Sequence, residues 1–122
     1  TIHEVDMRHH RDMRYHKPAE ALEFLTWTDR QHVAVSEKYG DGKGLKNLIQ
    51  GEWGKEVYCN RLRLSDCVDL FTKHGFELLK VERLEVLSET EIDRDRFVEP
   101  FRSKSMDDLS VLVARITARK RA

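Results

Sequence analysis

The sequence predicts an α/β fold, because one amphipathic helix and two extended segments follow one another in its second half. Within residues 60–87, the apolar side chains at helical spacing form a single stripe. These are Leu64, Cys67, Val68 and Phe71. The next run, residues 76–87, is apolar without helical spacing, and residues 109–119 alternate between apolar and polar side chains. We therefore expect a helix packed on a sheet.

The first third of the chain predicts a strand end, a polar loop and two short helices. Ile2, Val5 and Met7 alternate with polar residues, as in a strand that runs into a loop. The following residues up to Pro18 are dense in charge and histidine, which indicates a loop. Residues 19–24 favour a helix, and the dipeptide at positions 28 and 29 is typical of a second helix start. The apolar side of the first of these helices comprises Ala21, Leu22 and Leu25.

Residues 38–55 are expected to form a long loop, because five of the six glycines lie there. A loop of this length is more often functional or mobile than a plain connector.

Local signals also set the boundaries of the later elements. Ser65 stands where an N-cap is expected, and Asp66 places negative charge at the positive end of the helix dipole. Gly75 can adopt the left-handed conformation that ends a helix. Residues 93–101 predict a short helix, and Ser105 with its capping-box spacing predicts a turn before the last strand. The side chains expected to point inward from that short helix are Phe97, Val98 and Phe101.

Composition excludes several classes of function. The chain of 122 residues carries 22 basic and 22 acidic residues, so it has no basic surplus for binding nucleic acid or anionic lipid. A mean hydropathy of −0.65 and the absence of a long apolar run argue against a membrane span. Cys59 and Cys67 lack the spacing of a disulfide framework, which favours a cytoplasmic location. No glycine-rich phosphate loop is found.

Histidine and arginine supply the candidate functional groups. Four of the six histidines lie near the start, but their spacing matches no structural zinc pattern, so no metal site is predicted. We favour a polar loop beside a ligand pocket, and a solvated loop is the alternative. The segment Asn60–Arg63 could bind an anion through its polar side chains, or anchor a loop by backbone hydrogen bonds. A catalytic pair between Cys59 and a histidine is only weakly indicated.

Four segments, taken in order, resemble the C-terminal part of class I S-adenosylmethionine-dependent methyltransferases. They are HEVDMRHH, the stretch around Trp27, NRLRLSDCVDLFTKHGFELLKVER and SMDDLSVLVARITARK. In many members a strand ends in a run like His3, Asp6 and Arg8, and an NR(L/Y)R segment leads into a helix ending in GF. The closing motif is matched by Ser105, Asp107, Asp108, Leu109, Arg115 and Lys120. The resemblance spans nearly the whole chain and rests on the order of these motifs.

This resemblance implies one partial domain from a Rossmann-like sheet. A strand end and polar loop (1–16), a cap-like insertion (17–58) and a helix–strand–helix–strand unit (59–122) would follow one another. The implied elements are the end of the fifth strand (2–6), the last large helix (66–74), the sixth strand (76–87) and the seventh (109–119). The seventh strand would be antiparallel and lie between the other two.

The resemblance also implies a function for this segment. The family holds its cofactor with a glycine-rich loop and an acidic residue upstream of anything in this sequence. S-adenosylmethionine is therefore implied for the parent enzyme, while this segment would contain no cofactor-binding residue and be inactive alone. It would supply the acceptor side, with His3, Asp6 and His9 as candidate general bases. The remaining substrate-side candidates are Arg8, His16, Asn60 and Arg61.

The expected partners follow from this reading. A small-molecule acceptor is expected for the parent enzyme, and a second copy or a chain carrying the other half would pair with an exposed strand edge. The start at Thr1 without a methionine also suggests a piece of a longer protein. The competing interpretation is a self-contained α+β module that binds a ligand or a protein. A histidine-dependent enzyme without an organic cofactor is the least favoured.

Overall fold

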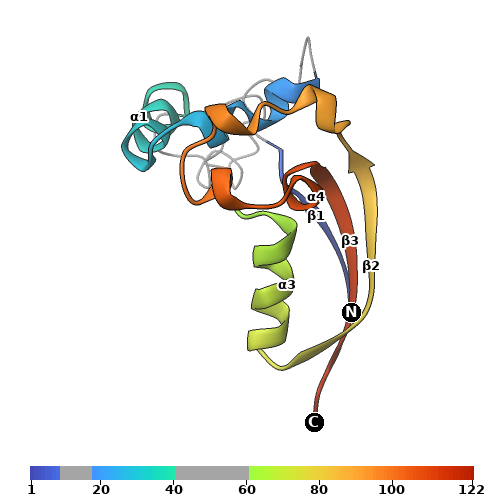
Figure 1. The fold of residues 1–122 in the computed structure, drawn as a ribbon. Helices are drawn as coiled ribbons and strands as arrows, with labels where there is room; N and C mark the ends of the chain where they lie inside the picture. Colours follow the sequence, from blue (N-terminus) through green and yellow to red (C-terminus); the bar gives the residue numbers. More distant parts are fainter. Residues whose placement is uncertain (9–17, 41–60) are drawn as a thin grey trace.

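Three strands form the sheet in the computed structural model, which describes residues 1–8, 18–40 and 61–122 (Figure 1). The strands are β1 (Ile2–Asp6), β2 (Phe76–Val86) and β3 (Val111–Lys120). The α-helices are α1 (Asp29–Gly40), α3 (Leu64–Lys73) and α4 (Met106–Leu109). The 3-10 helices are η1 (Pro18–Thr26), η2 (Glu89–Glu91), η3 (Arg94–Arg96) and η4 (Phe101–Ser103).

The last strand lies in the middle of this sheet. The strand order is β1-β3-β2, and β3 pairs antiparallel with both neighbours. β1 and β2 consequently run parallel to each other. The predicted order, with the last strand antiparallel and between the other two, is confirmed. β3 begins at Val111, two residues later than predicted, because Met106–Leu109 form the short helix α4.

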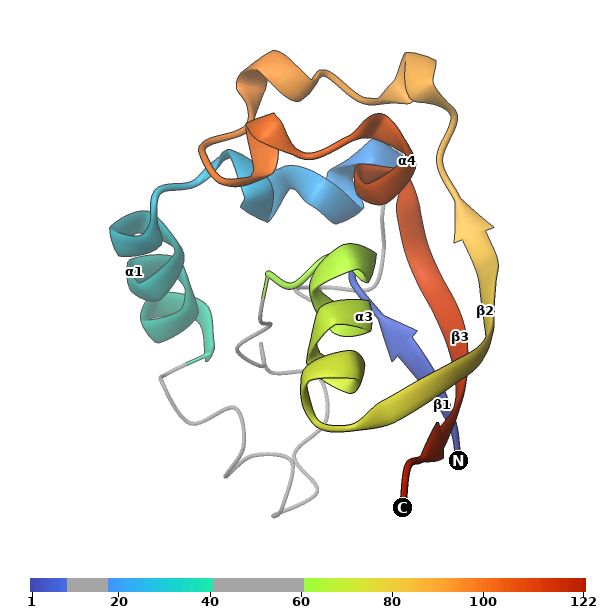
Figure 2. The ribbon, with the colours of Figure 1, turned by 60° about the horizontal axis from the view of Figure 1, so that its bottom comes forward.

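Helix α3 packs on one face of the sheet (Figures 1 and 2). Leu64 and Cys67 are buried there, whereas Val68 and Phe71 are only partly buried. The residues of the sheet and of the segment after β1 that complete this core are Met7, Val111, Ala114, Ile116 and Ala118. The apolar stripe read from the sequence is thus the contact face of the helix.

The opposite face of the sheet is charged. Paired residues in an antiparallel ladder share a face, and Arg115 stands opposite both Glu4 and Glu82. Arg115 forms an ion pair with Glu4 at 3.4 Å, and Lys80 forms one with Glu82 at 3.0 Å. Arg119 donates to Glu77 at 2.6 Å on the same face. This face is therefore open to solvent where it carries these ion pairs, whereas Val113, on the same face beside Asp6, is buried.

The boundaries of α3 agree with the sequence at one end and differ at the other. Gly75 has φ +80°, the left-handed conformation predicted for the helix stop. The predicted N-cap at Ser65 is wrong, because the helix begins at Leu64 and Arg63 occupies the cap position. Asp66 lies in the first turn as predicted and accepts the Arg63 backbone N–H at 2.8 Å. Ser65 instead makes a contact outside its own helix, described below.

A second core lies beyond the end of the sheet, among η1, the three-residue 3-10 helices and α4. Phe97 and Phe101 point inward as predicted, and both are buried. The single helix predicted for residues 93–101 is wrong, since η3 and η4 are separate one-turn helices. Pro100 lacks the N–H that a continuous helix would need at that position. The main buried residues are Ala21, Leu22, Phe24, Leu25, Leu87, Ile92, Phe97, Phe101, Leu109, Leu112 and Val113.

The two N-terminal helices occur where the sequence placed them, with different lengths. η1 is a 3-10 helix with the predicted apolar side chains buried. α1 begins at Asp29. The Gln31 N–H donates to the Thr28 hydroxyl at 3.1 Å, and the Thr28 N–H donates to the Gln31 side chain at 2.9 Å, which caps the helix start. The helix extends to Gly40, so the first residues of the predicted loop 38–55 are helical. The rest of that loop lies outside the described residues.

Candidate functional site

The carboxyl end of β1 is one candidate site, because open α/β sheets bind ligands beyond the carboxyl ends of their strands. Arg8 lies just after this end and donates to Asp6 at 2.6 and 2.9 Å. It also donates to Glu85, near the end of the parallel strand β2, at 3.2 Å. Two carboxylates therefore fix the direction in which the chain leaves the sheet.

The structure does not bring the described candidate bases together. His3 packs its ring against Phe71 under α3, with ring centroids 5.1 Å apart. Asp6 is paired with Arg8 at the end of the strand. Because strand side chains alternate, His3 and Asp6 lie on opposite faces of β1. The other candidates, His9, His16 and Asn60, lie outside the described residues.

Arg61 holds two helices together. Its guanidinium donates to the backbone carbonyls of Phe24, in the last turn of η1, at 3.3 Å and of Trp27, just after η1, at 2.6 Å. It also forms an ion pair with Asp29, the first residue of α1, and lies over the Phe101 ring at 5.0 Å. These contacts favour loop anchoring over anion binding for Arg61, the second of the two interpretations drawn from the sequence.

Arg63 is fully buried, with 0 % of its surface exposed. Its Nη2 donates to the Met7 carbonyl, and its guanidinium carbon lies 5.6 Å from the centre of the Phe24 ring. Within the described segments, Nε and Nη1 have no hydrogen-bond partner. Burial lowers the pKa of Arg63 to about 10, and the charges of nearby carboxylates oppose that change. The sequence marked this arginine as a candidate for anion binding, but not its burial.

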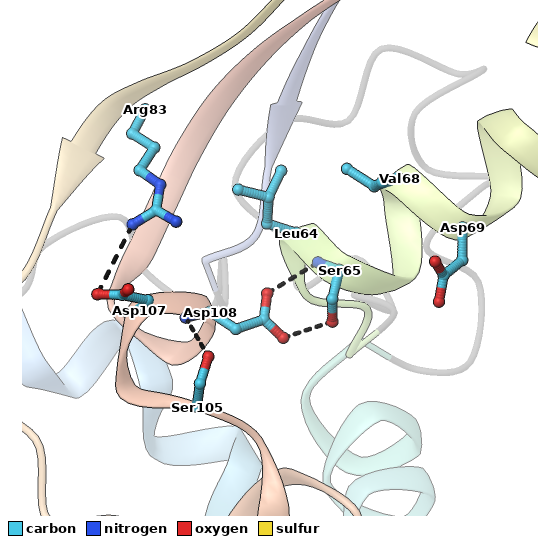
Figure 3. Close-up of a pocket in the computed structure, with 8 residues that line it drawn as sticks. All are labelled: Leu64, Ser65, Val68, Asp69, Arg83, Ser105, Asp107 and Asp108. Carbon is cyan, nitrogen blue, oxygen red and sulfur yellow. Dashed lines mark hydrogen bonds and ion pairs between the residues drawn. The ribbon is translucent and has the colours of Figure 1, made fainter. Parts of the chain in front are cut away.

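A groove of about 280 Å³ lies between α3, β2 and the α4 turn (Figure 3). Its lining residues are Leu64, Ser65, Val68, Asp69, Arg83, Ser105, Asp107 and Asp108.

Asp108 is the central residue of the groove and joins α4 to α3. Its carboxylate accepts from the Ser65 backbone N–H at 2.8 Å and from the Ser65 hydroxyl at 2.5 Å (Figure 3). Lys104 lies 3.6 Å from the same carboxylate and donates to Asp66 at 3.0 Å. The Asp108 backbone N–H donates to Ser105, the N-cap of α4, at 3.1 Å. These polar groups serve the packing of the two helix starts.

We expect the stability of the protein to depend on pH through the buried thiol of Cys67. Burial raises the pKa of the Cys67 thiol, and the neighbouring Asp66 carboxylate raises it further. The stabilisation is complete below the unfolded thiol's pKa, about 8.5. It is lost as the pH rises through the higher pKa of the folded thiol. We therefore expect the free energy of unfolding, measured by urea titration at a series of pH values, to fall as the pH rises above about 8.5. It should fall less in a Cys67→Ala variant. An identical alkaline loss in the variant would contradict this assignment.

Two kinds of feature are not found among residues 1–8, 18–40 and 61–122. No three metal-binding side chains come together in this part of the chain. None of its helices has the length and apolar character needed to cross a lipid bilayer.

Comparisons with protein-family models, curated proteins and solved structures were made for this chain. They find no match. The resemblance to methyltransferases therefore rests on the sequence segments that carry it, and the α/β fold rests on the arrangement of β1, β3, β2 and α3.

Proposed function

We propose that residues 1–122 form the acceptor-substrate side of an S-adenosylmethionine-dependent methyltransferase, whose cofactor-binding half lies on another stretch of polypeptide. The observation that carries this proposal is the strand order β1-β3-β2 with an antiparallel middle strand. It is the order that the resemblance implies for the fifth, seventh and sixth strands. Two independent features, the motif order and the strand order, thus support the same reading.

The two edges of the sheet differ, and the edge formed by β1 is the better suited to pairing with a further strand. Along β2 the register with β3 shifts three times, between Leu78 and Lys80 and twice between Arg83 and Val86. Bulges and charged side chains are the means by which proteins protect an edge from further pairing. β1 pairs with β3 over five consecutive residues without a shift. The outer edge of β1 is therefore the one suited to another strand.

The backbone of β1 also presents groups to that edge. Thr1 exchanges backbone hydrogen bonds with Ala118 of β3, and the Met7 N–H donates to the Leu112 carbonyl. In an antiparallel ladder alternate residues bond to the same neighbour, so His3 and Val5 face β3 while Ile2 and Glu4 face away. Ile2 is 69 % exposed. An added strand would bond to the peptide groups of Ile2 and Glu4 and cover part of that apolar surface.

The acceptor would lie beyond the carboxyl end of β1, where Arg8 links Asp6 to Glu85. Of the two described candidate bases, only Asp6 lies at this end. Methyl transfer is an in-line displacement, in which positioning of the acceptor contributes much of the rate. The paired carboxylates and Arg8 would then act mainly by holding the substrate-side loop in place.

One observation favours the alternative, a self-contained module that binds a ligand or a protein without catalysis. Sheets of doubly wound enzymes are usually covered on both faces, whereas the face of this sheet opposite α3 carries the Glu4–Arg115 and Glu77–Arg119 ion pairs. A charged face suits a small two-layer domain. It is also compatible with an enzyme whose sheet continues only at the β1 edge.

Calorimetry with S-adenosylmethionine tests the proposal. We expect no binding by residues 1–122, and binding by the same chain extended with the sequence encoded in frame before residue 1. Tight binding by residues 1–122 alone would refute the proposal that the cofactor-binding residues lie on another stretch of polypeptide. An extended chain that folds but does not bind would favour the module.

Amide hydrogen exchange supplies the matched control within β1. The amides of Ile2 and Glu4 should exchange rapidly in residues 1–122 and become protected in the extended chain. Those of His3 and Val5 should be protected in both, because they bond to β3. Unchanged exchange at Ile2 and Glu4 would show that no strand is added at this edge.

A further inference from the structure

We propose that Arg63 anchors a binding site for an oxyanion, the carboxylate or phosphate group of a ligand that reaches the carboxyl end of β1. We draw this from the surroundings of Arg63 alone, so it holds whether or not the chain belongs to a methyltransferase.

The hydrogen-bonding groups of Arg63 are the first observation. A guanidinium has five N–H donors, and the side chain of Arg63 has 0 % of its surface exposed to water. Nη2 donates to the Met7 carbonyl, while Nε and Nη1 have no partner in the described parts of the chain. Buried donors are almost always paired, so two unpaired nitrogen atoms of one guanidinium call for an acceptor from elsewhere.

The charge of Arg63 is the second observation. No carboxylate of the described segments forms an ion pair with it, although Asp108, Asp66 and Asp6 are near enough to act on it electrostatically. Each of these carboxylates already serves other donors. Asp108 accepts from Ser65, Asp66 accepts from Lys104 and from the Arg63 backbone, and Asp6 accepts from Arg8. A buried cation without a counter-ion is unfavourable, and a bound anion would remove that cost.

The geometry favours an oxyanion over other acceptors. Nε and Nη1 lie on different edges of the planar guanidinium, so each would donate a single hydrogen bond, and the positive charge of the group makes a negatively charged oxygen the strongest acceptor. The Met7 carbonyl and the Phe24 ring, 5.6 Å from the guanidinium carbon, hold this plane in position. Arg63 also directly precedes α3, whose ten residues place the positive end of a helix dipole at this point. Charged donors held in a fixed position therefore lie next to the end of β1.

Titration with inorganic phosphate and with acetate, followed by the Nε–Hε cross-peaks of arginine in ¹⁵N NMR spectra, tests the proposal. Sodium chloride at equal ionic strength is the control. The Arg63 cross-peak is identified by its loss in Arg63→Lys, or by through-bond assignment of the native protein if that variant does not fold. We expect this cross-peak to shift in a saturable way. A shift with phosphate only would indicate a phosphate-bearing ligand, and a shift with acetate only would indicate a carboxylate.

Thermal unfolding supplies the second readout, because a ligand that binds only the folded state raises the melting temperature. The anion that shifts the Arg63 cross-peak should raise the melting temperature of the native protein. It should do the same for Arg115→Lys, the matching change on the charged face of the sheet, but not for Arg63→Lys. An Arg63 cross-peak that moves with neither anion would overturn the proposal, as would an equal rise in melting temperature in all three proteins.

Discussion

Replacement of Asp108 by alanine is expected to lower the free energy of unfolding by about 3 kcal/mol, because a buried network would lose its central acceptor. The Asp108 carboxylate receives both the backbone N–H and the hydroxyl of Ser65 and lies 3.6 Å from Lys104. Its side chain is only 10 % exposed. Without it, the Ser65 N–H in the first turn of α3 loses its acceptor, and the contact between α3 and α4 is weakened. Urea unfolding followed by circular dichroism measures the loss.

The neighbouring residue provides the matched control. Asp107 has a side chain that is 77 % exposed, and its ion pair with Arg83 spans 3.9 Å. An exposed pair of this kind contributes at most about 1 kcal/mol, so Asp107→Ala should change stability little. Ser65→Ala, which removes only the hydroxyl, should fall between the two. Equal losses for Asp107→Ala and Asp108→Ala would show that the Ser65–Asp108 contact does not hold the helix starts together.

The elements that the sequence predicted correctly are those specified by local patterns. The stripe of α3, the left-handed Gly75 and the alternation of β3 each depend on neighbouring residues, so they can be read without tertiary structure. Ser65 shows the limit of such reading. It has the residue type and position of an N-cap, but its hydroxyl binds Asp108, 43 residues away. A contact at that distance along the chain leaves no local signal.

The candidate site shows the same contrast between features set by neighbouring residues and features set by contacts far along the chain. The sequence indicates that the segment before α3 is polar and could bind an anion. It does not predict that Arg63 is buried, because charged residues are expected on the surface. The carbonyl that accepts a hydrogen bond from the Arg63 guanidinium belongs to Met7, 56 residues away. By contrast, the separation of His3 and Asp6 follows from the sequence itself. Residues three apart in a strand point to opposite faces, so the motif spacing could not place both side chains in one pocket.

Replacement of Phe24 by alanine is expected to cost about 3–5 kcal/mol, the range for truncating a fully buried aromatic side chain. Phe24 has 0 % of its surface exposed and lies in the core formed by η1 and the chain between β2 and β3. Its ring also contacts His32 of α1, with centroids 6.0 Å apart, and faces the Arg63 guanidinium. The substitution would therefore leave a cavity and also remove the surface against which Arg63 lies.

Phe71 is the matched control, because it is also a helical phenylalanine but is only partly buried beside His3 and Phe76. Phe71→Ala should cost less, about 2 kcal/mol, since solvent can fill part of the space that the ring leaves. Phe24→Leu keeps most of the buried volume and should lose less than half of what Phe24→Ala loses. Chemical unfolding of the three variants gives the order. A smaller loss for Phe24→Ala than for Phe71→Ala would mean that η1 does not pack on this core, and that the wall beside Arg63 is formed differently.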